Sequence, residues 1–236
     1  MTYSIDLQEV WVEYQLRHAH HYNLKRTVSN LLTRRVERPE IISALRGVNL
    51  QVEPGQHLGI VGPNGSGKST MLSVITGTLT PTQGEARVQG RVLALLGGPS
   101  QGLDPEQSGE ENAIAIGVRL GESPSRMAEL LPSIIDFSGL GDRARHPVYT
   151  YSSGMQVRLR FSAITALKAD ILVVDEGIGM ADAEFNERAT GRLQEFYGSA
   201  GTLILASHSP DIIAQHCETA VTLIAGQITA SQALKK

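Results

Sequence analysis

The sequence has few of the residues that mark secreted or membrane-spanning proteins. Cys217 is the only cysteine among 236 residues, which excludes a disulfide framework and a cysteine metal cage. No apolar run approaches the ~20 residues that a membrane-spanning helix needs. The first residues, MTYSIDLQEV, lack the basic-then-apolar layout of a signal peptide. We therefore expect a protein of a reducing cytosol that does not cross a membrane unaided.

The chain also has no excess of positive charge. Its 21 Lys and Arg residues face 24 Asp and Glu residues, for a net charge of −3. This balance argues against general nucleic-acid binding, which requires a basic surface. Hydrophobic residues make up 41% and charged residues 19%, as in ordinary globular domains. We expect one domain, residues 1–236, with a sizeable core.

Short apolar runs that end in glycine or polar residues recur along the chain. They are HLGIV (57–61), RVLALLG (91–97), ILVVD (171–175), TLILAS (202–207) and AVTLIAG (220–226). Each has the length of a strand buried on both faces, and helical patterns lie between several of them, so the prediction is an α/β fold with a parallel sheet covered by helices. The stretch TPTQGEARVQGR (80–91) predicts antiparallel hairpins on the same layer. Amphipathic patterns over about 105–150 predict a helical subdomain.

The segment 15–39 is strongly basic. Its one acid, Glu37, stands against six basic residues: Arg17, Lys25, Arg26, Arg34, Arg35 and Arg38. A short amphipathic helix is predicted, with Asn23 as N-cap and an apolar face of Leu24, Val28, Leu31 and Leu32. The helix either packs on the domain as a solvated basic face or meets an anionic surface. His18, His20 and His21 form a surface cluster in preference to a metal site, because no carboxylate or cysteine is near them.

The stretch VGPNGSGKST (61–70) matches the phosphate-loop pattern G-x-x-x-x-G-K-[ST]. It follows a predicted strand and precedes a helical pattern, which is the context that supports the motif. Glycines let successive N–H groups turn inward around a phosphate, and the helix N-terminus adds partial positive charge. Lys68 can reach the β- and γ-phosphates, and the Ser69 hydroxyl can ligate Mg²⁺. The predicted phosphate-binding residues are Gly62, Pro63, Asn64, Gly65, Ser66, Gly67, Lys68, Ser69 and Thr70.

Three polar residues follow two other predicted strands of the same sheet. Asp175 and Glu176 end the run ILVVDE, where an α/β sheet binds its ligands. Asp175 can hold Mg²⁺, and Glu176 can orient and deprotonate an attacking water, although such a pair alone could be a solvated loop. His208, in LASHSPD, can approach the γ-phosphate. We predict ATP and Mg²⁺ as cofactors and Lys68, Glu176 and His208 as catalytic residues.

The stretch TYSSGMQVRLRFS (150–162) lies about two dozen residues before Asp175. It resembles the signature motif, usually LSGGQ, of the ATP-binding cassette (ABC) ATPases, with Tyr151, Ser152, Ser153, Gly154 and Met155 in the five places. In that family the motif caps the ATP held by a second subunit, so the resemblance implies a homodimer with Ser152, Ser153 and Gly154 near the partner's nucleotide. Without the other motifs, Ser152 would be read as an N-cap serine only.

The resemblance also implies further site residues and a fold. Asp182 lies at the dimer-contacting D-loop, and His208 matches the switch histidine. Tyr14 is the candidate for stacking on adenine, or is an ordinary half-buried strand residue. Gln101 lies near the place of the Q-loop glutamine, which senses Mg²⁺ and the membrane partner. The implied fold is a RecA-like parallel-sheet core with an antiparallel β subdomain and a helical subdomain.

Departures from the usual motifs resemble one branch of this family. The branch comprises the ATPases that export O-antigen, capsular polysaccharide and teichoic acid. Three stretches carry the resemblance: YSSGMQVRL in place of LSGGQ, the P-E-x-[ST]-G-x-E-N pattern over 105–112, and GMADAEF after Glu176. The resemblance implies an integral-membrane permease as partner, peripheral placement on the cytoplasmic face of the inner (plasma) membrane, and a lipid-linked glycan near residues 15–39. No nucleic-acid partner and no appended carbohydrate-binding domain are expected.

Other classes of protein remain as alternatives. The nearest is an exporter ATPase for another cargo, such as a lipid or a drug, because cargo is selected largely by the permease. An ABC ATPase of DNA repair or of the ribosome would need a coiled-coil insertion or a second cassette, which 236 residues do not accommodate. A regulatory subunit with a degenerate site is disfavoured by the presence of Lys68, Asp175, Glu176 and His208.

Overall fold

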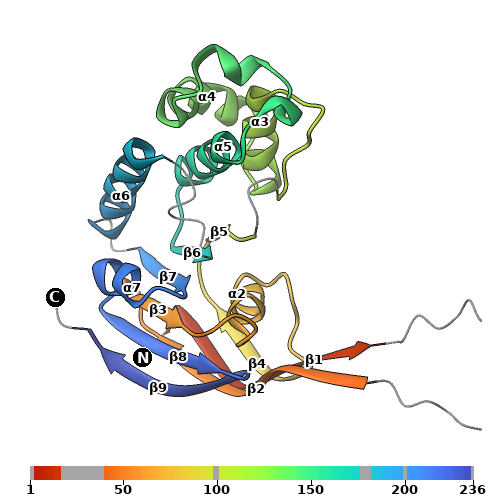
Figure 1. The fold of residues 1–236 in the computed structure, drawn as a ribbon, viewed down its shortest axis with the longest axis vertical. Coiled ribbons are helices and arrows are strands. Elements are labelled where there is room, and N and C mark those ends of the chain that lie inside the picture. Colours follow the sequence, from red (N-terminus) through yellow and green to blue (C-terminus); the bar gives the residue numbers. More distant parts are fainter. Residues whose placement is uncertain (1–2, 17–39, 98–100, 176–181, 199–200, 235–236) are drawn as a thin grey trace, which may run out of the picture.

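A computed structural model describes residues 3–16, 40–97, 101–175, 182–198 and 201–234. The chain forms two β-sheets with a group of helices beyond them (Figure 1). The smaller sheet has the order β2-β1-β4, with β1 (Ile5–Leu16) antiparallel to both β2 (Glu40–Val52) and β4 (Gln83–Val88). Alternate residues of β1, such as Val10 and Val12, are buried, as expected for a sheet with one covered face.

The larger sheet confirms the predicted α/β core. Its order is β5-β6-β7-β3-β8-β9, parallel except for β9 (Gln227–Ala233), which runs antiparallel to β8. Each predicted apolar run matches one of its strands: β3 (His57–Val61), β5 (Val92–Leu95), β6 (Ile171–Asp175), β7 (Thr202–Ser207) and β8 (Thr219–Ile224), the last of which begins one residue before its run. The runs are apolar throughout because both faces of the central strands are covered.

The prediction of hairpins over 80–91 is wrong. That stretch contains one strand, β4, and its partner is β1 of the smaller sheet. One of the turn residues that suggested a hairpin, Gly90 (φ 104°), instead forms part of the connection from β4 to β5. A β-carbon on Gly90 would stand 2.7 Å from Cβ of Asp170, so the close approach to the start of β6 also requires glycine.

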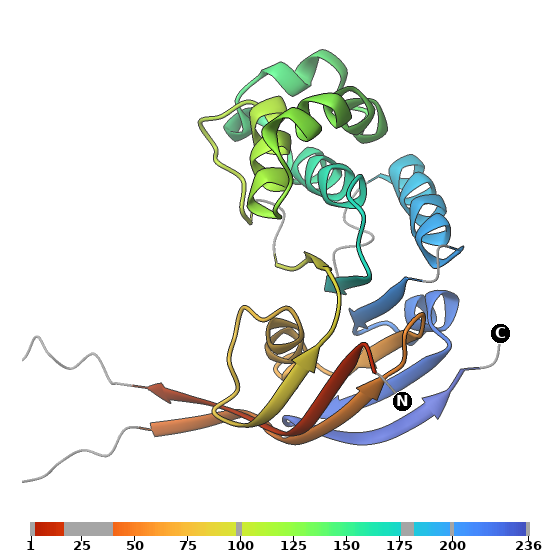
Figure 2. The same cartoon turned by 180° about the vertical axis from the view of Figure 1, so that it is seen from behind.

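Two helices lie against the sheets. Helix α2 (Lys68–Ile75) follows β3, and its Met71 and Leu72 are buried in a core shared with β1, β2 and β3. Helix α7 (Pro210–His216) follows β7 and packs on β3 through Ile213. The end of the β1–β2 pair projects from the sheets as an arm (Figures 1 and 2). The predicted basic helix, with Asn23 at its start, belongs to residues 17–39, which lie outside the described residues.

The helical group is joined to the larger sheet through β5 and β6 (Figure 2). It contains α3 (Gly109–Arg119), α4 (Pro124–Ser138), α5 (Ser153–Thr165) and two short 3-10 turns, η1 (Gly141–Arg145) and η2 (Val148–Thr150). Helix α6 (Ala183–Gly198) lies beside α5. The starts of α3 and α4 follow from the sequence, because Ser108 forms a capping box with Glu111 and Ser123 precedes Pro124 at the first helical turn. None of the described helices has the length and apolar content of a membrane span.

Candidate functional site

Three strands bring the phosphate loop, Asp175 and His208 to one edge of the larger sheet. Strands β6, β7 and β3 are neighbours and parallel, with Val61 paired to Ser207 and Asp175 paired to Ala206. The carboxyl ends of these strands are therefore level. The phosphate loop leaves β3, Asp175 ends β6, and His208 follows β7. This is the edge at which α/β sheets bind ligands.

The phosphate loop has a backbone that only glycine can follow. Gly65 and Gly67 have φ angles of 77° and 106°. A β-carbon on Gly67 would lie 2.6 Å from the carbonyl oxygen of Ala44 in β2, and one on Gly62 would lie 2.3 Å from that of Leu223 in β8. The loop is thus enclosed by β2 and β8, and it keeps its N–H groups close together in a shape that suits an anion.

Helix α2 begins at Lys68 with its first N–H groups directed to the loop. No side chain in the described part of the chain caps this helix start, whose N-cap is Gly67. Lys68 is 6% exposed, and its Nζ donates to the carbonyl oxygens of Gly62 (2.8 Å) and Pro63 (3.2 Å). The hydroxyl of Ser66 is buried with no hydrogen-bond partner among the described residues. A buried ammonium, an uncapped helix start and a spare hydroxyl together suit a phosphate group.

Ser69 and Asp175 meet at the sheet edge. The Ser69 hydroxyl donates to Oδ2 of Asp175 over 2.8 Å, with Ser69 exposed and Asp175 half-buried. A hydroxyl and a carboxylate are the hard oxygen ligands that Mg²⁺ takes, usually beside several waters and the phosphates of a nucleotide. In the described ranges no three His, Cys, Asp or Glu side chains gather as a metal cage. The pair therefore fits a shared magnesium ion, which Ser69 and Asp175 would hold.

Ser152 stands at the start of α5, in the helical group. Its hydroxyl accepts a hydrogen bond of 3.3 Å from the N–H of Met155 and so caps the helix. Ser152 and Ser153 are exposed and Gly154 is half-buried. Within one chain these residues lie in the helical group, whereas the phosphate loop lies against strands of the two sheets (Figure 1). The structure brings Lys68, Ser69 and Asp175 together and leaves Ser152 on another part of the surface.

A family model described as ABC transporter matches residues 45–179, which include the phosphate loop, Ser152 and Asp175. The chain belongs to the ABC transporter family. Over 188 residues it is 38% identical to the O-antigen export system ATP-binding protein RfbB of Myxococcus xanthus, an alignment of 80% of this chain and 43% of that protein. It is 33% identical over 228 residues to the teichoic acids export ATP-binding protein TagH of Bacillus cereus, covering 97% of this chain and 40% of that protein.

The chain spans about two fifths of the length of these two relatives. A third relative has nearly the same length: the O-antigen export system ATP-binding protein RfbE of Yersinia enterocolitica is 33% identical over 95% of this chain and 96% of its own. Among solved structures, the dimeric post-hydrolysis state of the ATP-binding cassette MJ0796 bound to ADP and Pi superposes with a TM-score of 0.78 at 21% identity, covering 98% and 99% of the two chains. This likeness confirms the predicted ABC fold.

Asp182, predicted to lie in the D-loop, makes a helix-capping hydrogen bond and an ion pair. Oδ1 of Asp182 accepts from the N–H of Phe185 over 2.9 Å at the start of α6, and its Oδ2 lies 3.4 Å from Nη1 of Arg158 in α5. The hydrogen bond from Phe185 and, to a smaller extent, the charge of Arg158 lower the pKa of Asp182. Sequence reasoning missed Arg158. Its position six residues after Ser152, on the helix that the signature motif opens, was the available signal.

Three other predicted site residues, Tyr14, Gln101 and His208, are exposed in the structure. Tyr14 is 43% exposed near the end of β1, opposite Ile42. A shift in the register of the β1–β2 pair, between Val12 and Glu13, separates Tyr14 from the buried Val12. Gln101 is exposed and lies over Gly97, just after β5, and His208 is exposed beyond β7. Glu176, predicted to act on water, lies outside the described residues.

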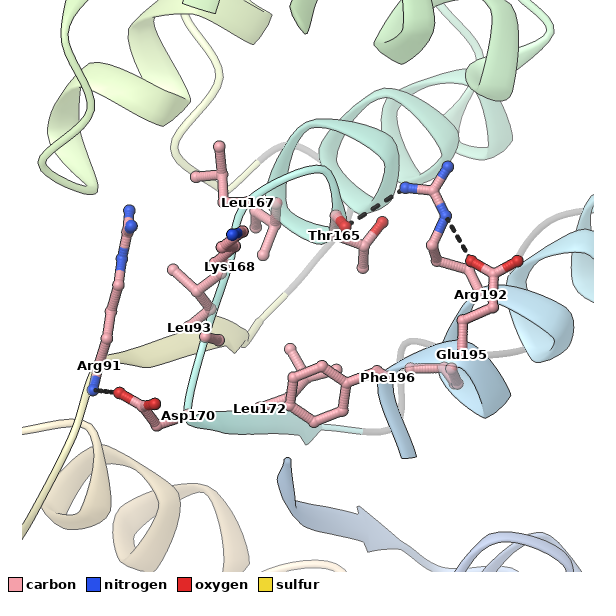
Figure 3. A pocket seen from close by; sticks show the side chains of 13 residues that line it. Arg91, Leu93, Thr165, Leu167, Lys168, Asp170, Leu172, Arg192, Glu195 and Phe196 are labelled. Carbon is pink, nitrogen blue, oxygen red and sulfur yellow. Dashed lines mark hydrogen bonds and ion pairs between the residues drawn. The ribbon is translucent and has the colours of Figure 1, made fainter. Parts of the chain in front are cut away.

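A cavity of about 560 Å³ lies at the opposite end of the strands (Figure 3). It opens where β5 and β6 begin, between the end of α5 and α6, and its lining includes Arg91, Leu93, Lys168, Leu172, Arg192 and Phe196. The main-chain N–H of Arg91 donates to Oδ2 of Asp170 over 2.6 Å. Because the cavity is at the amino ends of these strands and the phosphate loop is at the carboxyl ends, it is separate from the nucleotide site.

Proposed function

We propose that this chain is the ATP-hydrolysing subunit of an exporter that moves a lipid-linked polysaccharide or related cell-surface glycopolymer through a separate membrane permease. Relatives named for O-antigen and teichoic acid export support this cargo class. The 2.8 Å contact between Ser69 and Asp175, beside the phosphate loop, carries the hydrolytic part of the proposal. It joins the two magnesium-binding positions of an ATPase in one place.

Each residue of this site has a defined role in the proposed reaction. The loop N–H groups and Lys68 bind the β- and γ-phosphates of ATP, in place of the carbonyl oxygens that Lys68 now contacts. Magnesium, held by Ser69 and Asp175, would neutralise phosphate charge, with Gln101 as a further proposed ligand. Glu176 orients and deprotonates the attacking water, and His208 approaches the γ-phosphate from the end of β7.

Two copies of the chain would complete the site. Ser152 and the start of α5 from one copy donate hydrogen bonds to the nucleotide of the other, with Ser153 and Gly154 beside it. Asp182 contacts the facing copy near the same interface. ATP would bind more tightly to the closed pair than to the open one, so its binding closes the pair and its hydrolysis reopens it. This movement drives the permease.

The basic segment 15–39 is proposed to contact the membrane surface and the cargo. Each Arg or Lys near anionic headgroups adds ~1 kcal/mol of attraction, which suits a peripheral protein on the cytoplasmic face of the inner membrane. Guanidinium groups bind phosphates in a bidentate manner, so Arg17, Arg26 and Arg34 are proposed to meet the pyrophosphate of a lipid-linked glycan. Residues 17–39 of this segment lie outside the described residues, so its role is proposed from its charge and from the resemblance to the polysaccharide-export branch.

Purification of the chain with its membrane partner tests the proposal most directly. The expected complex contains two copies of this chain, an integral-membrane permease and a co-purifying glycolipid. Replacement of Arg17, Arg26 and Arg34 by Ala should lower glycan export while leaving basal ATPase activity unchanged. A complex that contains a permease but transports another lipid or a drug would favour the alternative cargo. A chain without ATPase activity in that complex would contradict the proposal as a whole.

A further inference from the structure

Asn112 is a buried polar residue whose amide is fully used. It lies in the first turn of α3 and is 1% exposed. Its Oδ1 accepts from the N–H of Asp104 over 2.7 Å, and its Nδ2 donates to the carbonyl oxygens of Asp104 (2.9 Å), Gln107 (3.2 Å) and Ser108 (2.9 Å). One N–H faces the oxygen and three carbonyls face the nitrogen, so the amide has only one satisfactory orientation. Asn112 therefore fixes the loop 104–108.

This loop is bonded in turn to the residues that precede Ser152. The carbonyl oxygen of Gln107 also accepts from the N–H of Val148 (2.9 Å), and that of Pro105 accepts from the N–H of Tyr149 (2.9 Å). An isolated bridge pairs Ser108 with Pro147. The path from Asn112 to the 3-10 turn η2 thus takes two hydrogen bonds that share one carbonyl group.

The turn η2 leads directly into the signature motif. The N–H of Tyr151 donates to the carbonyl of Val148 over 2.9 Å, and Ser152 follows as the cap of α5. The Tyr151 ring is buried, its hydroxyl donates to the carbonyl of Arg143 (2.8 Å), and it lies against Gly109. A β-carbon on Gly109 would stand 2.3 Å from the Tyr151 hydroxyl oxygen. The first turn of α3 therefore supports the backbone of Ser152 through both Asn112 and Gly109.

We propose that Asn112 is a positioning residue for the signature serine: it sets the place of Ser152 through the loop 104–108 and the turn η2. The inference rests on the proposed dimer, in which Ser152 contacts the nucleotide of the other copy. Loss of the Asn112 amide leaves the phosphate loop of its own chain untouched, because that loop is built from the two sheets and α2. It weakens closure of the pair, and with it turnover.

The test measures two constants in full-length protein that carries Glu176→Gln, so that bound ATP persists. The first is the affinity of the monomer for a fluorescent ATP analogue, and the second is the dissociation constant of the ATP-bound dimer by analytical ultracentrifugation. Asn112→Ala should weaken the dimer at least tenfold and change monomer affinity less than twofold. Combining Asn112→Ala with Ser152→Ala should weaken the dimer no further than Ser152→Ala alone, because both changes remove the same contact, that of Ser152 with the nucleotide of the other copy.

A matched control separates positioning from general loss of stability. Met127 is fully buried between α3 and α4, where it packs on Gly117, and it has no part in the hydrogen-bond path. Met127→Ala should lower the thermal midpoint of unfolding by an amount similar to Asn112→Ala, yet change the dimer constant less than threefold. Equal weakening of the dimer by the two variants would overturn the inference, as would unchanged dimerisation of Asn112→Ala or additive effects with Ser152→Ala.

A second pair of variants tests the same link without Asn112. Gly109→Ala should weaken the dimer, because its β-carbon would stand 2.3 Å from the Tyr151 hydroxyl oxygen and 3.1 Å from the carbonyl oxygen of Ala144. Adding Tyr151→Phe removes the closer clash but also the hydrogen bond to Arg143, so it should restore part of the loss. No restoration would contradict the link. If the parent Glu176→Gln protein fails to dimerise with ATP, the proposed function fails and the inference with it. If the parent dimerises and the Asn112 variant does so equally well, only the inference fails.

Discussion

The hydroxyl of Ser69 donates a hydrogen bond of 2.8 Å to Oδ2 of Asp175, a residue 106 positions later in the chain. Ser69 is in the first turn of α2, and Asp175 is the last residue of β6. The contact exists because β3 and β6 end at the same edge of one parallel sheet. It is the structural reason for proposing a magnesium-dependent reaction at this edge.

Replacing Ser69 by Ala, or Asp175 by Asn, should lower the rate of ATP hydrolysis by about 100-fold or more, because each change removes a proposed oxygen ligand of the metal. Turnover measured against magnesium concentration checks this. Ser73→Ala is the matched control, since its hydroxyl is on the same helix and donates to the carbonyl of Ser69 (2.8 Å). Normal turnover in Ser69→Ala would remove that residue from the site.

Gly67→Ala should abolish nucleotide binding and destabilise the fold by roughly 1–3 kcal/mol, since it combines a left-handed backbone with a clash. Gly77 provides the control. It also has a positive φ, 70°, but a β-carbon there would have nothing within 4 Å, whereas one on Gly67 would lie 2.6 Å from the Ala44 oxygen. Gly77→Ala should cost about 1 kcal/mol and keep ATP affinity. Denaturant titration and nucleotide binding measure both quantities. Equal behaviour of the two variants would show that the approach to β2 is unimportant.

Tyr14→Ala should raise the KM for ATP by about tenfold if the ring stacks on adenine, and Tyr14→Phe should leave it unchanged. Tyr14 lies two residues after Val12, whose partner in the β1–β2 pair is Leu45. A β-carbon on Gly67 of the phosphate loop would lie 3.1 Å from Cδ2 of Leu45, so this part of β1 is close to the loop. Steady-state kinetics with ATP and GTP distinguish the two roles. An unchanged KM in Tyr14→Ala would leave Tyr14 as an ordinary strand residue.

Cys217 should be inert in the folded protein. Burial, aided by the charge of Glu218, raises the pKa of its thiol to about 12. At pH ~8.5 the folded thiol therefore stays protonated, whereas an exposed thiol, whose pKa is ~8.5, is half ionised. Labelling at pH 8.5 should be on the order of 1,000-fold slower in native protein than in denaturant. The raised pKa also means that this thiol's contribution to stability is complete below pH ~8.5 and declines above it. Native labelling within tenfold of the unfolded rate would contradict the assignment.

The sequence predicted those parts of the site that depend on short patterns. The phosphate loop and the end of β6 are contiguous stretches, and the five apolar runs each match a strand because their hydrophobic residues are consecutive. The partner of β4 was not predictable in this way. Its residues alternate weakly, and the choice of β1 as partner depends on a sheet formed by residues far apart in the sequence.

The supporting contacts of the signature motif were also beyond local patterns. Asn112 was part of a motif assigned to the family branch, but its four hydrogen bonds depend on how the loop 104–108 folds back over α3. Likewise, the contact between Arg158 and Asp182 joins two helices through side chains that no spacing rule connects. Such contacts follow from packing, which a single sequence does not display.

The most direct test of the account is a crystal structure of the Glu176→Gln protein with ATP and magnesium. The account predicts a symmetric pair in which each ATP lies between Lys68 of one copy and Ser152 of the other. A structure in which Lys68 binds ATP while Ser152 of every copy remains distant from all nucleotides would contradict it.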